Sequence, residues 1–396
     1  MVLDDGAATG HGRTCSPAIN YGRNREIPAK KPRGSIPRPK GRQQNLPAAG
    51  RYHNGAEAAA SMVLTRRFPD RAGRGKLAHG EQDAVGERPL MVEKLEKIWL
   101  NGGFVPWDEA KVHVLTHTLH YGLGAFEGIR CYKRHDGRSA IFRLREHVDR
   151  LFESAHIGDL PMSWSRDEVT QACTETVRVN KLDECYLRPL VYIGEGAMGL
   201  YGRDNPVQLT IAAWRWGAYL GDEGLEHGIR AKVSSYTRSG INSTMTKAKL
   251  VGNYVNSMLA KREVVGAGYQ EAIMLDAQGY VSEGSGENVF MIKRGKLYTP
   301  SVGASILAGI TRATIIELVA ELGLTIEERA ITRDEMYVAD EVFFTGTAAE
   351  VTPVREIDDR KIGSGARGPL TKRIQDRFFE VVRGPELLHP EWLSFV

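Results

Sequence analysis

The sequence contains few cysteines, no long apolar run and little net charge, and each shortage excludes a class of protein. Its four cysteines form no CxxC pair and no metal-like spacing, which favours free thiols in a reduced compartment over a disulfide framework; they are Cys15, Cys131, Cys173 and Cys185. The chain has no run of about 18 apolar residues, so no membrane-spanning helix is predicted. Its start lacks the basic residues and apolar core of a secretion signal. We therefore expect a cytoplasmic protein.

The net charge of +4 arises in the leading segment, residues 1–90, and is too small to predict nucleic-acid binding. This segment holds 16 basic and 8 acidic residues and 8 of the 17 prolines. It has no helical or strand periodicity and too little apolar surface to offset the entropy of ordering it. We predict a disordered basic extension, either a solvated tail or translated sequence ahead of a start at Met91. Contact between this tail and RNA is the alternative.

The rest of the chain predicts a mixed α+β fold in two domains, residues 91–220 and 225–396, with a glycine-containing connection between them. Apolar periodicity predicts helices over 147–156, 167–181, 250–264 and 311–322. Apolar runs of strand length occur at 97–100, 186–193, 208–214, 231–236, 271–275, 289–292 and 341–345. The first of them precedes the turn Asn101-Gly102-Gly103, which predicts a hairpin.

Two glycine-containing turns are candidate phosphate sites. Residues 308–312 lead into a predicted helix, and residues 345–348 follow a predicted strand. Glycine lets a backbone approach a ligand closely, and the start of a helix offers free N–H groups to an anion. Neither turn matches a Walker loop or the GxGxxG fingerprint, so an ATPase or a Rossmann dehydrogenase is disfavoured.

Two lysines stand where a polar turn leads into an apolar helix, which favours a partly dry pocket. In such a pocket the pKa of a lysine falls and its amine can attack a carbonyl carbon. Spacing does not choose between Lys247 and Lys249. Residues 281–290 place carboxylates in a glycine-rich connection between strands, where one of them can face a cofactor nitrogen.

Three histidines have the i, i+4, i+7 spacing of one helical face; they are His113, His117 and His120. Zinc would need further ligands, and no cysteine or acidic cluster completes the set. We predict no metal site.

Together these residues resemble the class IV aminotransferases, the pyridoxal-phosphate enzymes of fold type IV, and among them the branched-chain amino acid aminotransferases. The similarity runs from about Ile98 to about Arg373. It is carried by residues 111–114, 120–122, 126–132, 216–221, 252–254, 282–288, 309–312 and 346–350. So many ordered matches are more specific than any single motif. The resemblance implies a smaller N-terminal α+β domain, a larger C-terminal domain, a short interdomain loop and pyridoxal 5'-phosphate as cofactor.

The resemblance also implies roles for single residues. The cofactor-binding lysine lies five residues before the tyrosine of Gly252-Asn253-Tyr254, which is Lys249. Tyr254 is implied to hydrogen-bond the phenolic oxygen, and Glu283 to face the pyridine nitrogen. The implied phosphate ligands are Arg150, Ile310, Thr311 and Thr347. The implied substrate residues are Tyr121, Phe126, Tyr186, Trp216 and Tyr219 around the side chain, Arg188 for a distal carboxylate, and Thr347 with Ala348 for the α-carboxylate.

The implied reaction is reversible amino transfer from leucine, isoleucine or valine to 2-oxoglutarate, giving the branched 2-oxo acid and glutamate. A homodimer or a dimer-based hexamer is implied, because loops of one subunit help to close the other's site in this family. A D-amino acid aminotransferase and an aminodeoxychorismate lyase are the alternatives within the fold, and a non-catalytic RNA-binding protein is a remote one. The stretches 126–132 and 216–221 favour the branched-chain type.

Overall fold

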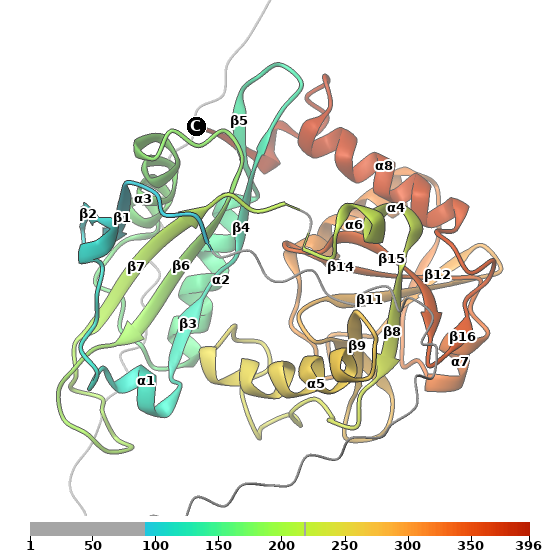
Figure 1. Ribbon diagram of the computed structural model, residues 1–396, viewed down its shortest axis with the longest axis horizontal. Helices are drawn as coiled ribbons and strands as arrows, with labels where there is room; N and C mark the ends of the chain where they lie inside the picture. The colour runs from blue at the N-terminus through green and yellow to red at the C-terminus, as the bar shows by residue number, and fades with distance from the viewer. Residues whose placement is uncertain (1–91, 218) are drawn as a thin grey trace, which may run out of the picture. The chain divides into compact units, whose positions relative to one another are not determined.

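The computed structural model describes residues 92–217 and 219–396, and the predictions for residues 1–90 lie outside these ranges. Within them the chain forms two β-sheets with helices packed on each (Figure 1), so the predicted α+β class is confirmed. No helix in the described part of the chain is both long and apolar enough to cross a lipid bilayer.

The first sheet has eight strands, all paired antiparallel. In chain order these are β1 (Lys97–Leu100), β2 (Gly103–Pro106), β3 (Gly124–Phe126), β4 (Ile129–Lys133), β5 (Ser139–Phe142), β6 (Cys185–Ile193), β7 (Val207–Trp214) and β17 (Leu393–Phe395). The helices of this region are η1 (Trp107–Glu109), α1 (His117–Tyr121), α2 (Leu144–Ile157) and α3 (Arg166–Val179). The last strand, β17, pairs with β5, so the C-terminal end of the chain returns to this sheet.

Local chemistry explains how these elements begin and turn. The predicted hairpin forms between β1 and β2, with Asn101 and Gly102 at positive φ (50° and 107°), as a tight turn between twisted strands requires. Helix α3 starts at a capping box, in which Ser165 and Glu168 each bond to the backbone N–H of the other. Helix α2 buries Val148, Leu151 and Ala155 on one face, as its periodicity predicts.

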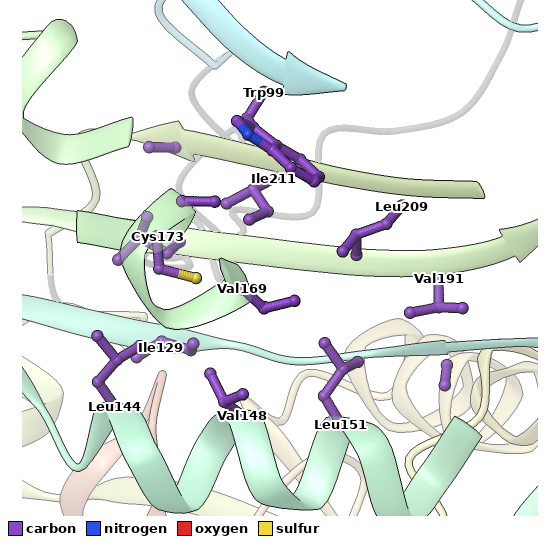
Figure 2. Close-up of a cluster of buried hydrophobic side chains, with 14 of the residues drawn as sticks. Trp99, Ile129, Leu144, Val148, Leu151, Val169, Cys173, Val191, Leu209 and Ile211 are labelled. Carbon is purple, nitrogen blue, oxygen red and sulfur yellow. The ribbon is translucent and has the colours of Figure 1, made fainter. Parts of the chain in front are cut away.

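The first core lies between this sheet and the helices α2 and α3. Figure 2 shows Leu144, Val148 and Leu151 of α2 pointing toward the strands, with Ile129 and Ile211 among the residues opposite. These five side chains are almost completely buried. Burial of aliphatic side chains is worth about 1.5–3 kcal/mol each, so the cluster holds α2, and with it Arg150, against the sheet.

The second sheet has nine strands and is mixed, with the parallel pairs β8·β9, β8·β15 and β12·β13. Its strands are β8 (Ile229–Val233), β9 (Glu271–Leu275), β10 (Val281–Gly284), β11 (Asn288–Lys293), β12 (Lys296–Thr299), β13 (Ile326–Glu328), β14 (Glu341–Gly346), β15 (Glu350–Ile357) and β16 (Arg360–Lys361). The accompanying helices are α4 (Asp222–His227), η2 (Val251–Asn253), α5 (Tyr254–Gly266), α6 (Ile310–Glu321), α7 (Arg333–Tyr337), α8 (Pro369–Arg383) and η3 (Pro390–Trp392).

Two predictions for this region are wrong in ways that matter for the site. The helix predicted from Leu250 begins at Tyr254, because Leu250 is extended and bridges Ala125 of the first sheet. The carboxylates predicted in a loop are partly in a strand, since β10 contains Glu283 and all four of its residues are buried. At Leu250 the bridge to a distant strand decides the local conformation, whereas β10 pairs with β9, the strand just before it in the chain.

Helix α5 also buries a different face from the one that its apolar residues predict. Its buried residues are Ser257, Ala260 and Val264, whereas the side chains of Met258 and Leu259 are 51% and 40% exposed. The small residues pack on the sheet, and the large apolar side chains face outward within this chain.

Candidate active site

An open cavity is lined both by helix α2 and by the segments around β10, β14, α5 and α6. All seven residues predicted for catalysis and cofactor binding line it. They are Arg150, Lys249, Tyr254, Glu283, Ile310, Thr311 and Thr347. Elements that lie far apart in the sequence therefore meet at one concave site.

Lys249 is fixed by its backbone and presents its amine to this cavity. Its N–H donates to Ser154 Oγ (3.0 Å), and its carbonyl accepts from the N–H of Phe126 (3.1 Å). At the other end, Lys249 Nζ donates to Tyr254 Oη (2.6 Å) and lies 5.0 Å from the centroid of the Phe126 ring. The amine is thus held between a phenol and an aromatic face.

Lys247, the other candidate, points elsewhere. Its Nζ donates to the backbone carbonyls of Val302 and Ile306, and the residue does not line the cavity. Burial lowers the pKa of Lys247, against the charge of Glu283, which raises it. The structure therefore separates two lysines that their spacing left equivalent.

Glu283 is a buried carboxylate with a partner on each oxygen. Oε1 forms an ion pair with Arg238 Nη2 (2.6 Å), and Oε2 accepts hydrogen bonds from the N–H of Leu307 and from Asn288 Nδ2, both at 3.1 Å. Burial raises the pKa of Glu283, and the Arg238 guanidinium and the N–H of Leu307 oppose that rise. A protonated ring nitrogen beside this carboxylate would, like Arg238, favour the ionised form of Glu283.

A second group of cavity residues is suited to an anion, and both predicted turns contribute to it. Helix α6 starts at Ile310, and its N-cap, Gly309, makes no side-chain cap bond, so the first-turn N–H groups are available to a ligand. Thr311 and Thr347 add hydroxyls, and Arg150 adds a guanidinium. The two glycine-containing turns, each a weak indication in the sequence, thus contribute to one site.

Arg150 is held in place by a buried acid that we did not predict. Glu127 is fully buried, and its two oxygens accept from Arg150 Nε (2.7 Å) and Nη2 (2.9 Å). The ring of His147 also contacts Glu127 Oε2, at 2.7 Å through Nδ1. Burial alone would raise the pKa of Glu127, but Arg150 and His147 hold it well below the usual range.

The predicted side-chain pocket is an aromatic group around Arg188. The guanidinium carbon lies 4.7 Å from the ring centroid of Phe126 and 5.5 Å from that of Tyr186. The ring of Trp216 lies 4.6 Å from Tyr186 and 5.6 Å from Tyr219. Phe126 joins this group to the cavity, since its ring lies 4.9 Å from that of Tyr254.

Tyr121 does not join the other predicted substrate residues within this chain. It ends helix α1, is 42% exposed and packs against His117, with ring centroids 4.5 Å apart. The prediction that three histidines share one helical face also fails, because α1 begins at His117 and leaves His113 outside it. His117 Nε2 instead contacts the carbonyl of Gly199 at 2.7 Å.

Arg130 was also missed, although it lies within the quoted stretch 126–132. Its guanidinium donates to the carbonyls of Thr347 (3.1 Å), Ala348 (3.1 Å) and Gly217 (2.9 Å), and its side chain is only 3% exposed. Glu350 lies 3.5 Å from Arg130 Nη1. Arg130 therefore fixes the turn that carries Thr347 and Ala348 and ties it to the segment before α4.

The side chains that line the cavity fit the functional groups of pyridoxal phosphate. It offers an amine for an aldehyde, a carboxylate for a ring nitrogen and donors for a phosphate. Thr345 Oγ1, in a residue that lines the cavity, is buried and has no hydrogen-bond partner among the described residues. Buried hydroxyls are rarely left unpaired, so this one indicates a bound acceptor.

Comparison with known proteins agrees with this chemistry. Residues 124–357 match the model of the family "Amino-transferase class IV". The branched-chain-amino-acid aminotransferase of Pseudomonas aeruginosa is 53% identical over 306 residues, which is 77% of this chain and 99% of that protein. That of Escherichia coli K12 is 49% identical over 312 residues, 78% of this chain and 99% of the other.

Solved structures have the same fold. The branched-chain amino acid aminotransferase of Thermobaculum terrenum, solved in its pyridoxal-phosphate form, is 37% identical, with a TM-score of 0.72, over 76% of this chain and 99% of that one. The fold, the cavity and these similarities agree. The chain belongs to the class IV aminotransferases, the pyridoxal-phosphate enzymes of fold type IV.

Proposed function

We propose that the protein is a branched-chain L-amino acid aminotransferase, which moves the amino group of leucine, isoleucine or valine to 2-oxoglutarate. The observation that carries the proposal is the meeting of Lys249, Glu283 and Arg150 in one cavity. Relatives that bear this name are about half identical to the chain over nearly their whole length, which supports the choice of substrate class.

Lys249 is the proposed catalytic residue. When bound, pyridoxal phosphate supplies an aldehyde that captures amino groups and a ring that accepts the electron pair released from the substrate's Cα. Lys249 would hold the cofactor covalently through Nζ, and the same amine, when free, would remove the substrate's Cα proton and return a proton. Tyr254, 2.6 Å from Nζ, keeps the amine oriented.

Glu283 and the residues of the anion site are proposed to bind the two polar groups of the cofactor, its ring nitrogen and its phosphate. The Glu283 carboxylate would hold a proton on the ring nitrogen of the bound cofactor, which would let the ring accept electrons. Arg150, Thr311 and Thr347, with the N–H groups that begin α6 at Ile310, would hold the phosphate. Held at both groups, the cofactor would keep its reacting carbon within reach of Lys249.

Substrate selection follows from the aromatic group. Phe126, Tyr186, Trp216 and Tyr219 offer apolar faces to a branched side chain, and Arg188 offers a charge to the distal carboxylate of glutamate. The Thr347-Ala348 turn, fixed by Arg130, binds the carboxylate on Cα. One pocket can therefore accept leucine and glutamate in turn.

We propose at least a homodimer, in which Tyr121 and the loop 198–201 of one subunit help to close the partner's site. Large apolar side chains lie exposed on this chain: Leu200 is 89%, Tyr201 77% and Val255 61% exposed. Exposed apolar surface of that kind favours association with a second copy. We also propose a reducing compartment such as the cytoplasm, since Cys131, Cys173 and Cys185 are free and buried.

The test is amino transfer to 2-oxoglutarate by the purified, cofactor-supplied protein. Glutamate formed from L-leucine, L-isoleucine and L-valine, with none from D-alanine, is the expected result. Activity with D-alanine alone would identify a D-amino acid aminotransferase, and conversion of aminodeoxychorismate without amino transfer would identify the lyase. Either result would replace the proposal.

A further inference from the structure

A second buried acid lines the cavity wall, and the chemistry proposed above gives it no role. Glu287 lies in the turn between β10 and β11, lines the cavity and is only 4% exposed. Behind it, Glu271 of β9 is fully buried. Two carboxyl groups thus share a region that excludes water, where each negative charge needs a compensating partner.

The cation and the other hydrogen-bond donors described here contact Glu271. Lys261 of α5 forms an ion pair with its Oε2. Oε1 accepts from Ser285 Oγ (2.6 Å) and from the N–H of Ala272 (2.7 Å). One cation and two further donors therefore satisfy Glu271 as an anion.

Glu287 has fewer hydrogen-bond donors than Glu271. In residues 92–217 and 219–396 its carboxyl group accepts one hydrogen bond, at Oε2 from the N–H of Gly286 (3.0 Å). Its Oε2 also occupies the space beside Gly284, where an added Cβ would lie 2.8 Å away. Lys261 forms its ion pair with Glu271, and Glu287 forms none among the described residues. A buried carboxyl group whose hydrogen bond comes from a peptide N–H and which forms no ion pair favours its neutral form.

We infer that Glu287 carries a proton at neutral pH and forms an uncharged wall beside the turn that binds the substrate's α-carboxylate, so that its ionisation weakens binding of carboxylate substrates. This inference rests on the proposed function. The position of Glu287 supports it: a Cβ added at Gly346, the residue before Thr347, would lie 3.6 Å from Glu287 Cγ. A negative charge at Glu287 would repel an anion held by that turn.

The charged and titratable groups that face Glu287 come from four elements. They are Glu271 on β9, Lys261 on α5, Glu283 on β10 and Tyr219 in the segment before α4. Burial first, and then the charge of Glu271, raises the pKa of Glu287 to about 8, while Lys261 and the N–H of Gly286 act in the opposite direction. Ionisation of Glu287 therefore falls within the range in which the enzyme can be assayed.

The experiment measures binding of a carboxylate that cannot react. Calorimetric titration of the holoenzyme with 4-methylvalerate, which is leucine without its amino group, is carried out from pH 7 to pH 9. We expect the wild-type dissociation constant to rise at least about threefold more over this range than that of Glu287→Gln, in which the wall stays neutral. Glu226→Gln, an exposed change in α4, is the matched control and should follow the wild type.

A second measurement detects the protonated carboxyl group of Glu287 directly. Infrared difference spectra of the holoenzyme at pH 7, wild type minus Glu287→Gln, should contain the carbonyl band of a protonated carboxyl group. In the wild type this band should disappear as the pH rises through about 8. Glu287→Asp, which keeps a carboxyl group, should retain both the band and the pH dependence of binding. If Glu287→Gln does not fold, a carboxyl band that changes frequency between the wild type and Glu287→Asp still assigns the proton to residue 287, and a band with the same frequency in both overturns the inference.

Equal pH dependence in the wild type and Glu287→Gln, or no protonated carboxyl band at pH 7, would overturn the inference. Failure of the proposed function looks different. In that case none of the proteins, the Glu226→Gln control included, would bind 4-methylvalerate or transfer amino groups from L-leucine.

Discussion

Arg238 Nη2 lies 2.6 Å from Glu283 Oε1, and both side chains are more than nine-tenths buried. The arginine thus supplies a positive charge to the carboxylate proposed to face the cofactor's ring nitrogen. We predict that Arg238→Met raises the pKa of Glu283 further and lowers kcat for L-leucine by about 10- to 100-fold. Steady-state kinetics of the cofactor-saturated variant measure this. Arg238→Lys should recover part of the loss, and a methionine variant with wild-type kcat would contradict this role for the ion pair.

The two lysines give a matched pair of variants. Lys249→Ala should lose the absorbance of the covalently bound cofactor and lower amino transfer by several orders of magnitude, because the residue is both the attachment point and the proposed base. Lys247→Ala removes bonds to the carbonyls of Val302 and Ile306 and should stay within about tenfold of the wild type. Reversal of these two results would transfer the catalytic role to Lys247.

Glu127 tests how the phosphate ligand is positioned. Glu127→Gln cannot accept both guanidinium N–H groups of Arg150 as an anion does, so we expect about 10-fold or greater weakening of pyridoxal phosphate binding. Equilibrium dialysis with the cofactor gives the dissociation constant. Glu146→Gln is the control, because Glu146 lies on α2 with Arg150 but pairs with Arg143. Similar affinities in all three proteins would show that Arg150 does not depend on Glu127.

Arg188 tests dual substrate recognition. Its guanidinium is stacked among aromatic rings, and its Nε is buried with no partner among the described residues. We predict that Arg188→Ala lowers kcat/KM for glutamate and 2-oxoglutarate at least about 10-fold more than for leucine, because leucine has no distal carboxylate. An equal loss on all three substrates would remove this role from Arg188.

Local patterns in the sequence were sufficient for the elements whose structure local forces decide. The face of α2 and the hairpin between β1 and β2 follow from periodicity and from the Asn-Gly-Gly turn. The predicted start of α5 was wrong at Leu250, because a bridge to Ala125 in the other sheet sets the conformation there. Contacts across more than a hundred residues leave no trace in a local pattern.

The same distinction applies to the site. Sequence similarity named seven residues that line the cavity, but not the residues that pair with them, such as Arg238 with Glu283 and Glu127 with Arg150. These supporting residues act through charges brought together only by folding. Tyr121 shows the converse, since its motif is recognisable but its place within one chain is exposed and away from the other substrate residues.

The most direct test of the central claim is the visible absorbance spectrum of the purified, cofactor-supplied protein before and after addition of L-leucine. If Lys249 binds pyridoxal phosphate and Glu283 faces its ring nitrogen, the protein is yellow, and leucine converts that band to one at shorter wavelength while the branched 2-oxo acid appears. A protein that stays colourless, or a band that L-leucine leaves unchanged, would contradict the claim.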